Sequence, residues 1–112
     1  MLAHNVRIRN HDDHHIFDKN TGIRINYSRD IDIGKQVWIG EGVSLLPGAR
    51  IGCGSIVGEN AVTSSQFPDH VIIAGSPAKV IRENICWSRD NIFDFNRGSL
   101  DECLDQNAKK YL

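Results

Sequence analysis

The chain has 112 residues, a formal net charge of −1 and 24% charged side chains. This length predicts a single domain, and the near-neutral charge excludes nucleic acid as the expected partner. No apolar stretch is long enough to span a membrane, and Met1 does not begin a signal peptide. The three cysteines are scattered without a metal-site spacing. We therefore expect reduced thiols in a cytoplasmic protein.

The first part of the chain contains one short unit and a long interruption. Residues 3–8 resemble a single six-residue unit, with Val6 and Ile8 as its apolar positions. Residues 9–30 are polar, hold three of the five histidines and include the turn signal Asn20-Thr21-Gly22. We interpret residues 9–30 as a loop that leaves the fold. Loops of this length are usually functional or disordered.

A six-residue periodicity then runs from Ile31 to Val62. Its first row of small or branched side chains is Ile31, Val37, Val43, Ala49, Ser55 and Ala61, and its second row is Ile33, Ile39, Leu45, Ile51 and Val57. Glycine follows four members of the second row, at Gly34, Gly40, Gly52 and Gly58. We attribute these glycines to backbone freedom at turns. A parallel β-helix repeats every six residues, whereas the period of two in a strand meander does not explain the glycines.

The remaining segments depart from the periodicity. Pro68 and Pro77 flank a short apolar strand predicted at residues 71–74, within an exit segment at residues 67–82. Trp87 is expected to pack against the prism that the stacked coils of the β-helix form. These features define an all-β unit at residues 1–82.

Residues 83–112 form a predicted C-terminal extension. Ser99 to Glu102 fits a capping box and predicts a helix at about residues 99–110. The regular repeats make fewer than two full coils, so the ends of so short a prism expose strand edges and apolar side chains. We therefore expect three prisms to assemble side by side.

Two longer motifs carry a family resemblance. Val37-Trp38-Ile39-Gly40 and Ala74-Gly75-Ser76-Pro77-Ala78-Lys79-Val80-Ile81-Arg82 resemble the hexapeptide-repeat acyltransferases. Asp12-Asp13-His14-His15-Ile16-Phe17-Asp18 resembles their capsular and sialic-acid polysaccharide O-acetyltransferase branch, near the galactoside and maltose O-acetyltransferases. The resemblance covers residues 3–87. It implies a left-handed parallel β-helix, a homotrimer with sites between neighbouring prisms, and acetyl-CoA as the donor to a sugar hydroxyl.

The resemblance also implies roles for individual residues. His14 matches the family's general base, and a neutral imidazole suits proton removal near neutral pH. Asp12 is a candidate for orienting or polarising the His14 ring. Trp38 is either an outward aromatic that covers the coil or a wall for the pantetheine arm or the acceptor. A backbone N–H at Gly40 or Glu41 is the expected oxyanion donor.

The positions that match the family's CoA contacts are Gly40, Glu41, Glu59, Ser64, Ser65, Lys79 and Arg82. Lys79 and Arg82 are expected to face the nucleotide phosphates, because cations form strong hydrogen bonds with phosphate. Two positions depart from the family. Ser65 stands where many relatives carry lysine, and Glu59 stands where alanine is frequent; both departures weaken the expected binding.

Two alternative functions remain open. Relatives have further coils before the match to residues 3–6, so a fragment or remnant that trimerises or binds CoA without turnover is one alternative. His11, His14 and His15 suggest a zinc enzyme of the carbonic-anhydrase type as the other. Adjacent histidines tend to point apart, however, and the six-residue repeats hold no histidine. We therefore expect no metal.

Overall fold

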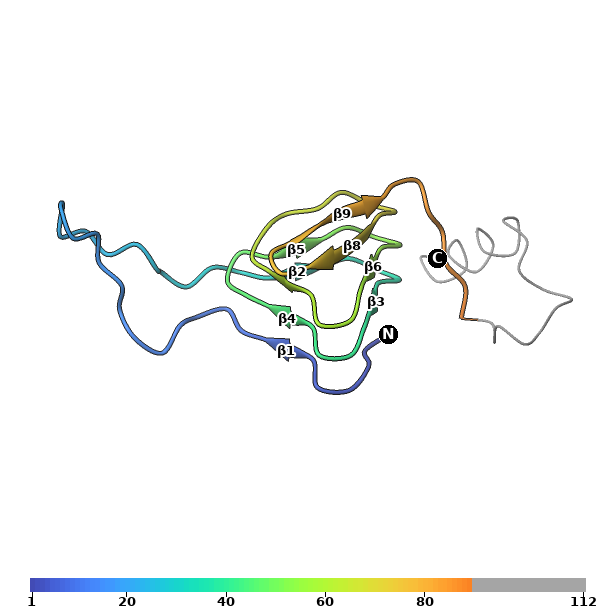
Figure 1. Ribbon diagram of the computed structural model, residues 1–112, viewed down its shortest axis with the longest axis horizontal. Helices are drawn as coiled ribbons and strands as arrows, with labels where there is room; N and C mark the ends of the chain where they lie inside the picture. The colour runs from blue at the N-terminus through green and yellow to red at the C-terminus, as the bar shows by residue number, and fades with distance from the viewer. Residues whose placement is uncertain (90–112) are drawn as a thin grey trace, which may run out of the picture.

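The structure, a computed structural model, describes residues 1–89, so the helix predicted at residues 99–110 lies outside the described residues. The described chain is a left-handed parallel β-helix, as predicted, in which short strands stack as coils of a triangular prism (Figure 1). One face holds β1 (Arg7–Ile8), β4 (Ser44–Leu45) and β7 (Val62–Thr63); the second holds β2 (Asp32–Ile33) and β5 (Arg50–Ile51); the third holds β3 (Trp38–Ile39), β6 (Ile56–Val57), β8 (Ile72–Gly75) and β9 (Ala78–Arg82).

The register of these sheets shows that three hexapeptides make one coil. Asp32 pairs with Arg50 and Trp38 pairs with Ile56, each in parallel and each with an offset of 18 residues. Three corners separate the faces. We call them the Glu41 corner (residues 40–43 and 58–61), the Ser64 corner (46–49 and 64–65) and the His70 corner (34–37, 52–55 and 68–71).

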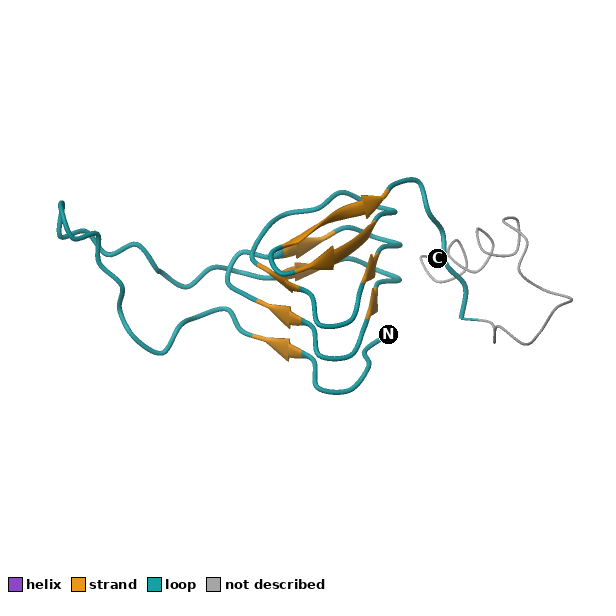
Figure 2. Cartoon of the chain, in the orientation of Figure 1, coloured by secondary structure: helices purple, strands orange, loops and turns teal. Residues whose placement is uncertain are grey.

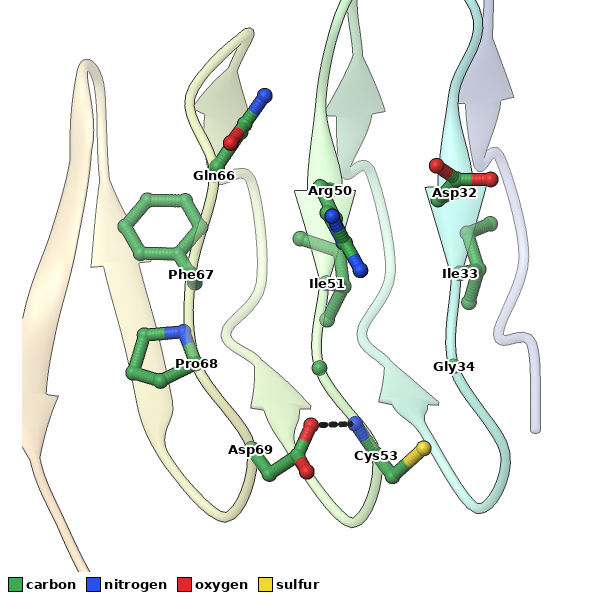
Figure 3. A pocket seen from close by; sticks show the side chains of 11 residues that line it. Asp32, Ile33, Gly34, Arg50, Ile51, Cys53, Gln66, Phe67, Pro68 and Asp69 are labelled. Atoms are coloured by element: carbon green, nitrogen blue, oxygen red, sulfur yellow. Dashed lines mark hydrogen bonds between the residues drawn. The ribbon is translucent and has the colours of Figure 1, made fainter.

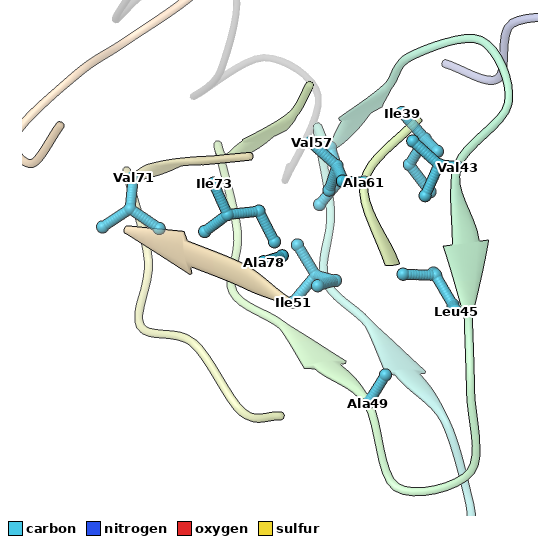
Figure 4. Close-up of a cluster of buried hydrophobic side chains, with 11 residues drawn as sticks. Ile39, Val43, Leu45, Ala49, Ile51, Val57, Ala61, Val71, Ile73 and Ala78 are labelled. Atoms are coloured by element: carbon cyan, nitrogen blue, oxygen red, sulfur yellow. The ribbon is translucent and has the colours of Figure 1, made fainter. Parts of the chain in front are cut away.

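Both apolar rows of the six-residue pattern face the interior of the prism (Figure 4). The fully buried members include Ile39, Val43, Leu45, Ala49, Ile51, Val57 and Ala61. Ser55, the polar member of the first row, is also fully buried. Its hydroxyl accepts a hydrogen bond from the N–H of Val71 at 3.2 Å and donates one to the carbonyl of Pro68 at 3.4 Å. The polar group is therefore satisfied inside the core.

The repeating glycines serve a different purpose from the one predicted. The left-handed backbone conformation occurs instead at other corner positions, namely Gln36, Gly42, Gly48, Gly54, Asn60 and His70. At Gly52 a methyl group would lie 2.4 Å from backbone atoms of Pro68 in the next coil, and at Gly40 it would lie 3.0 Å from the N of Glu59. These glycines are thus required because adjacent coils approach closely.

The exit segment forms a hairpin at the end of the prism. The strand predicted at residues 71–74 is present as β8, which extends the third face. The chain then turns at Gly75 (φ +100°) and returns as β9, antiparallel to β8, with Lys79 paired to Ala74. The sequence did not predict β9.

Residues 9–30 leave the prism as an extended arm between β1 and β2, visible at the left of the view (Figure 2). The arm has an outgoing limb (residues 9–17) and a returning limb (residues 24–30). An isolated bridge between Phe17 and Arg24 joins the two limbs, as does a hydrogen bond from the N of Ile25 to the carbonyl of Ile16, at 2.9 Å. The predicted loop excursion is therefore confirmed.

Residues 83–89 run back along the prism as a strap. The N of Ile85 donates to the carbonyl of His70 at 3.0 Å, and the Trp87 indole donates to the carbonyl of Gln36 at 2.8 Å. Trp87 is buried, as expected. The prediction of reduced thiols is wrong for Cys86, which takes part in a disulfide, whereas Cys53 is free.

Candidate active site

His14, the candidate general base, lies exposed on the outgoing limb of the arm. A single side chain from the returning limb, Asn26, binds the backbone that directly follows the His14 Cα. The Asn26 amide nitrogen donates to the carbonyl of His14 at 2.7 Å, and its oxygen accepts from the N of Ile16 at 2.7 Å. Sequence reasoning missed Asn26, because its partners on the outgoing limb lie 10 to 14 residues away and no local motif marks it.

The carboxylate of Asp12 also contacts this amide. It accepts a hydrogen bond from the Asn26 nitrogen at 3.0 Å. Among residues 1–89, no hydrogen bond joins Asp12 to the His14 ring, so the orienting role of Asp12 stays a prediction. The neighbouring carboxylate, Asp13, forms an exposed ion pair with Arg9 at 3.4 Å.

The other arm histidines do not build a metal centre with His14. The described chain contains no group of three or more His, Cys, Asp or Glu side chains that could hold a metal ion. The ring of His15 instead packs edge-on against Phe17, with centroids 6.1 Å apart. The zinc alternative thus finds no support in the arm.

Four of the predicted CoA contacts gather at the Glu41 corner. Gly40 stacks closely on the backbone of Glu59, and the N of Asn60 donates to the carbonyl of Glu41 at 2.8 Å. Ala74 lies over Gly58 in the next coil, and its pairing partner Lys79 thereby joins the same corner. A surface groove of about 710 Å³ adjoins it, lined by Asn5, Val6, Arg7, Glu41, Gly42, Ser44, Glu59 and Asn60.

The remaining CoA candidates lie elsewhere. Arg82 pairs with Ile72 at the opposite end of β9 from Lys79. Ser64 and Ser65 lie at the Ser64 corner, where the N of Ser65 donates to the Thr63 hydroxyl at 3.0 Å.

The arm that carries His14 leaves the prism at the Ser64 corner. Arg9, the first residue of the arm, donates from its N to the carbonyl of Leu45 at 2.9 Å. Arg29, near the end of the arm, packs over the turn at Gly48. His14, Ser64 and Ser65 therefore lie on the side of the Ser64 corner, whereas Gly40, Glu41, Glu59 and Lys79 lie at the Glu41 corner. Trp38 and Arg82 lie on the third face.

Trp38 lies on the third face with 40% of its surface exposed. Its ring packs against the buried Trp87 ring, with centroids 5.7 Å apart and a tilt of 50°. One side of the indole thus covers the strap while the other remains open. Both interpretations of Trp38 stay compatible with this geometry.

A second hollow, of about 740 Å³, crosses the face formed by β2 and β5 (Figure 3). Asp32, Arg50 and Gln66 form an outward row across it, and Asp69 accepts a hydrogen bond from the N of Cys53 at 2.7 Å. No predicted site residue lines this hollow, so we do not place the chemistry there.

The relatives of this chain agree with the fold and the motifs. No protein-family model matches it. The polysialic acid O-acetyltransferase of Escherichia coli O1:K1 / APEC is 40% identical over 89 residues, which make up 80% of this chain and 29% of the relative. The crystal structure of the polySia-specific acetyltransferase NeuO matches with a TM-score of 0.80 and 35% identity, over 93% of this chain and 44% of that chain.

A galactoside acetyltransferase in complex with coenzyme A also matches, with a TM-score of 0.52 and 37% identity over 73% of this chain and 44% of that chain. The triangular prism and these likenesses define a left-handed β-helix of the acetyltransferase type. These relatives and structural neighbours are hexapeptide-repeat acetyltransferases, in agreement with the family that the motifs resemble. It spans less than half the length of the relatives named here.

Proposed function

We propose that this protein is an O-acetyltransferase that moves an acetyl group from acetyl-CoA to a sugar hydroxyl. The likeness to NeuO carries the proposal, because it extends over 93% of the chain and both structures belong to one fold. The galactoside acetyltransferase bound to coenzyme A supports the choice of donor. The names of the relatives support a saccharide acceptor.

The chemistry requires a base, a site for negative charge and a leaving group. His14 takes the proton of the acceptor hydroxyl as that oxygen attacks the thioester carbonyl. The carbon–sulfur bond then breaks, and the CoA thiolate recovers the proton from His14. A backbone N–H at Gly40 or Glu41 stabilises the charge on the carbonyl oxygen. No residue of this chain needs to form a covalent intermediate.

The division of the site between two corners favours a homotrimer. The Ser64 and Glu41 corners point apart in one triangular prism, so a single copy does not bring His14 to the Glu41 group. Two neighbouring copies can place unlike corners against each other. The arm also exposes large apolar side chains with 50–63% of their surface open, namely Ile16, Phe17, Ile23, Ile25 and Tyr27. Such a concentration favours contact with another copy.

Within this trimer the CoA phosphates lie near Lys79 and Arg82, both exposed on β9. Trp38 forms a wall for the pantetheine arm or the acceptor. We place the protein in the cytoplasm, where acetyl-CoA is available. Within residues 1–89 there is no helix of the length and apolar character that crossing a membrane requires.

The direct test follows the release of free CoA thiol from acetyl-CoA in the presence of saccharide acceptors. His14→Ala removes the proposed base, and loss of general base catalysis lowers turnover by about 10²–10⁴-fold. His15→Ala is the matched control, because it removes an exposed imidazole from the next position and leaves turnover intact. Equal turnover in His14→Ala and the parent would remove His14 as the base.

Calorimetry separates the non-catalytic alternative. A remnant that only binds CoA would show heat of binding without thiol release, and Lys79→Ala would weaken that heat. Failure of the parent protein to bind acetyl-CoA would contradict the proposed function.

A further inference from the structure

The arm contains one polar side chain whose full hydrogen-bonding capacity is used. A carboxamide offers two N–H donors and an oxygen with two lone pairs. The nitrogen of Asn26 donates to Asp12 at 3.0 Å and to the carbonyl of His14 at 2.7 Å. Its oxygen accepts from the N of Ile16 at 2.7 Å and from the Arg24 guanidinium at 3.3 Å. All four positions of the amide are therefore occupied.

The hydrogen bonds of Asn26 connect the two limbs of the arm over a stretch in which no backbone–backbone hydrogen bond of the described chain connects them. Backbone hydrogen bonds join the two limbs at Asn10 with Arg29 and at Ile16 with Ile25. Between those points, no backbone–backbone hydrogen bond connects residues 11–15 to another described residue. The Asn26 side chain crosses this gap and is half-buried, while His14 itself is exposed. It is thus the principal link between His14 and the returning limb.

We propose that Asn26 is the positioning residue of His14, an inference that rests on the proposed function of His14 as the base. Asn26 binds the Asp12 carboxylate, which precedes His14, and the His14 carbonyl and Ile16 N–H, which follow the His14 Cα along the backbone. The imidazole then departs from a defined backbone position, with only its own two side-chain torsions free. Asp12 belongs to the same clamp, because the amide that holds His14 also holds its carboxylate.

Asparagine is the residue type that fits this position. Aspartate has nearly the same size, but it lacks both donors and places a carboxylate against Asp12 and the His14 carbonyl. Glutamine keeps the donors and the acceptor but is longer by one methylene group. The aspartate substitution therefore tests the hydrogen-bonding groups of the amide, and the glutamine substitution tests the length of the side chain.

The test compares Asn26→Asp with Asn20→Asp in the full chain. Both variants exchange an amide for a carboxylate on the same arm, but no hydrogen bond of the Asn20 side chain occurs in the described chain. Misplacing a reacting group by about 1 Å can lower turnover about 10²-fold. We expect Asn26→Asp to lower kcat by about that factor with the KM for acetyl-CoA unchanged, because the Glu41 group is untouched. Asn20→Asp should match the parent in both constants.

A second readout does not depend on turnover. In two-dimensional NMR spectra, Asn26→Asp should displace the Ile16 amide and the His14 ring resonances, and Asn20→Asp should leave them in place. Asn26→Gln, which keeps both donors, covers the case in which Asn26→Asp does not fold. Unmoved His14 resonances, or an unchanged kcat with the Ile16 resonance displaced, would overturn the positioning role. A parent without acetyl transfer would contradict the proposed function alone, and the resonances would still decide whether Asn26 holds His14.

Discussion

At the scale of single residues, the tip of the arm, where the two limbs meet, contains the Asp18 carboxylate, whose ionised form stabilises the local structure. The backbone N–H groups of Thr21 and Asn20 donate to the Asp18 carboxylate and hold the pKa of Asp18 below its ordinary value of 3.8. A lowered folded-state pKa means that the ionised form stabilises the tip. This contribution is present above the unfolded pKa and is lost as pH falls through the lower folded value.

The Thr21 amide resonance reports this loss. Its position should titrate with a midpoint below pH 3.8, and the tip should loosen as the carboxylate is protonated. Asp18→Asn removes the titration and serves as the control. A midpoint above 3.8 would contradict the hydrogen-bonded tip.

The repeating glycines offer a second prediction at this scale. Gly52→Ala places a methyl group 2.4 Å from backbone atoms of Pro68. Because the obstacle is backbone, we expect a loss of about 3 kcal/mol in the free energy of unfolding, the upper end of the usual range for overpacking. Gly22→Ala is the matched control: its φ is +70° but no atom lies within 4 Å of the added methyl. That variant should lose only about 1 kcal/mol, from backbone strain. Equal losses in chemical denaturation would show that coil contact is not what selects Gly52.

At the scale of elements, the strap of residues 83–89 is held to the prism by one aromatic anchor. Trp87→Phe removes the hydrogen bond to Gln36 but keeps an apolar ring, and it should lower the free energy of unfolding by about 1 kcal/mol. Trp87→Ala also empties a buried site and should lower it by about 3–5 kcal/mol.

Circular dichroism provides a specific readout of this anchor. Trp38 and Trp87 lie close and tilted, with centroids 5.7 Å apart, so their transitions should couple. The coupled signal should disappear in Trp87→Phe and equally in Trp38→Phe. Survival of the signal in either variant would contradict the packing of the strap on β3.

The elements also show what the sequence could and could not predict. Two rows of apolar residues at a spacing of six determine both the coil and its register, because three hexapeptides close one turn. The antiparallel return of β9 carries no such periodicity and follows from the turn at Gly75. Asn26 was missed for a related reason, since its partners on the outgoing limb are distant in sequence and depend on how the two limbs meet. The purpose of the glycines became evident only from the distance between coils.

At the scale of the whole molecule, the apolar arm predicts an assembly. Ile23 has 63% of its surface exposed in one copy, so Ile23→Glu should leave the fold of the prism intact. A charge placed in a contact between copies should instead separate the proposed trimer, and native mass spectrometry should then detect one chain rather than three. Asn20→Glu adds the same charge nearby and should preserve the trimer if the apolar side chains form the contact. A parent that is monomeric at all concentrations would contradict the assembly.

We propose that one acetyl-transfer site is built from two copies of this chain, with His14 from one and the Glu41 corner from its neighbour. The most direct measurement mixes two inactive variants, His14→Ala and Lys79→Glu, allows the copies to exchange, and follows CoA thiol release. Mixed trimers contain sites in which both original residues meet, so activity should reappear in the mixture while each variant alone stays inactive. If exchange is verified by mass spectrometry and no activity returns, the shared site is contradicted.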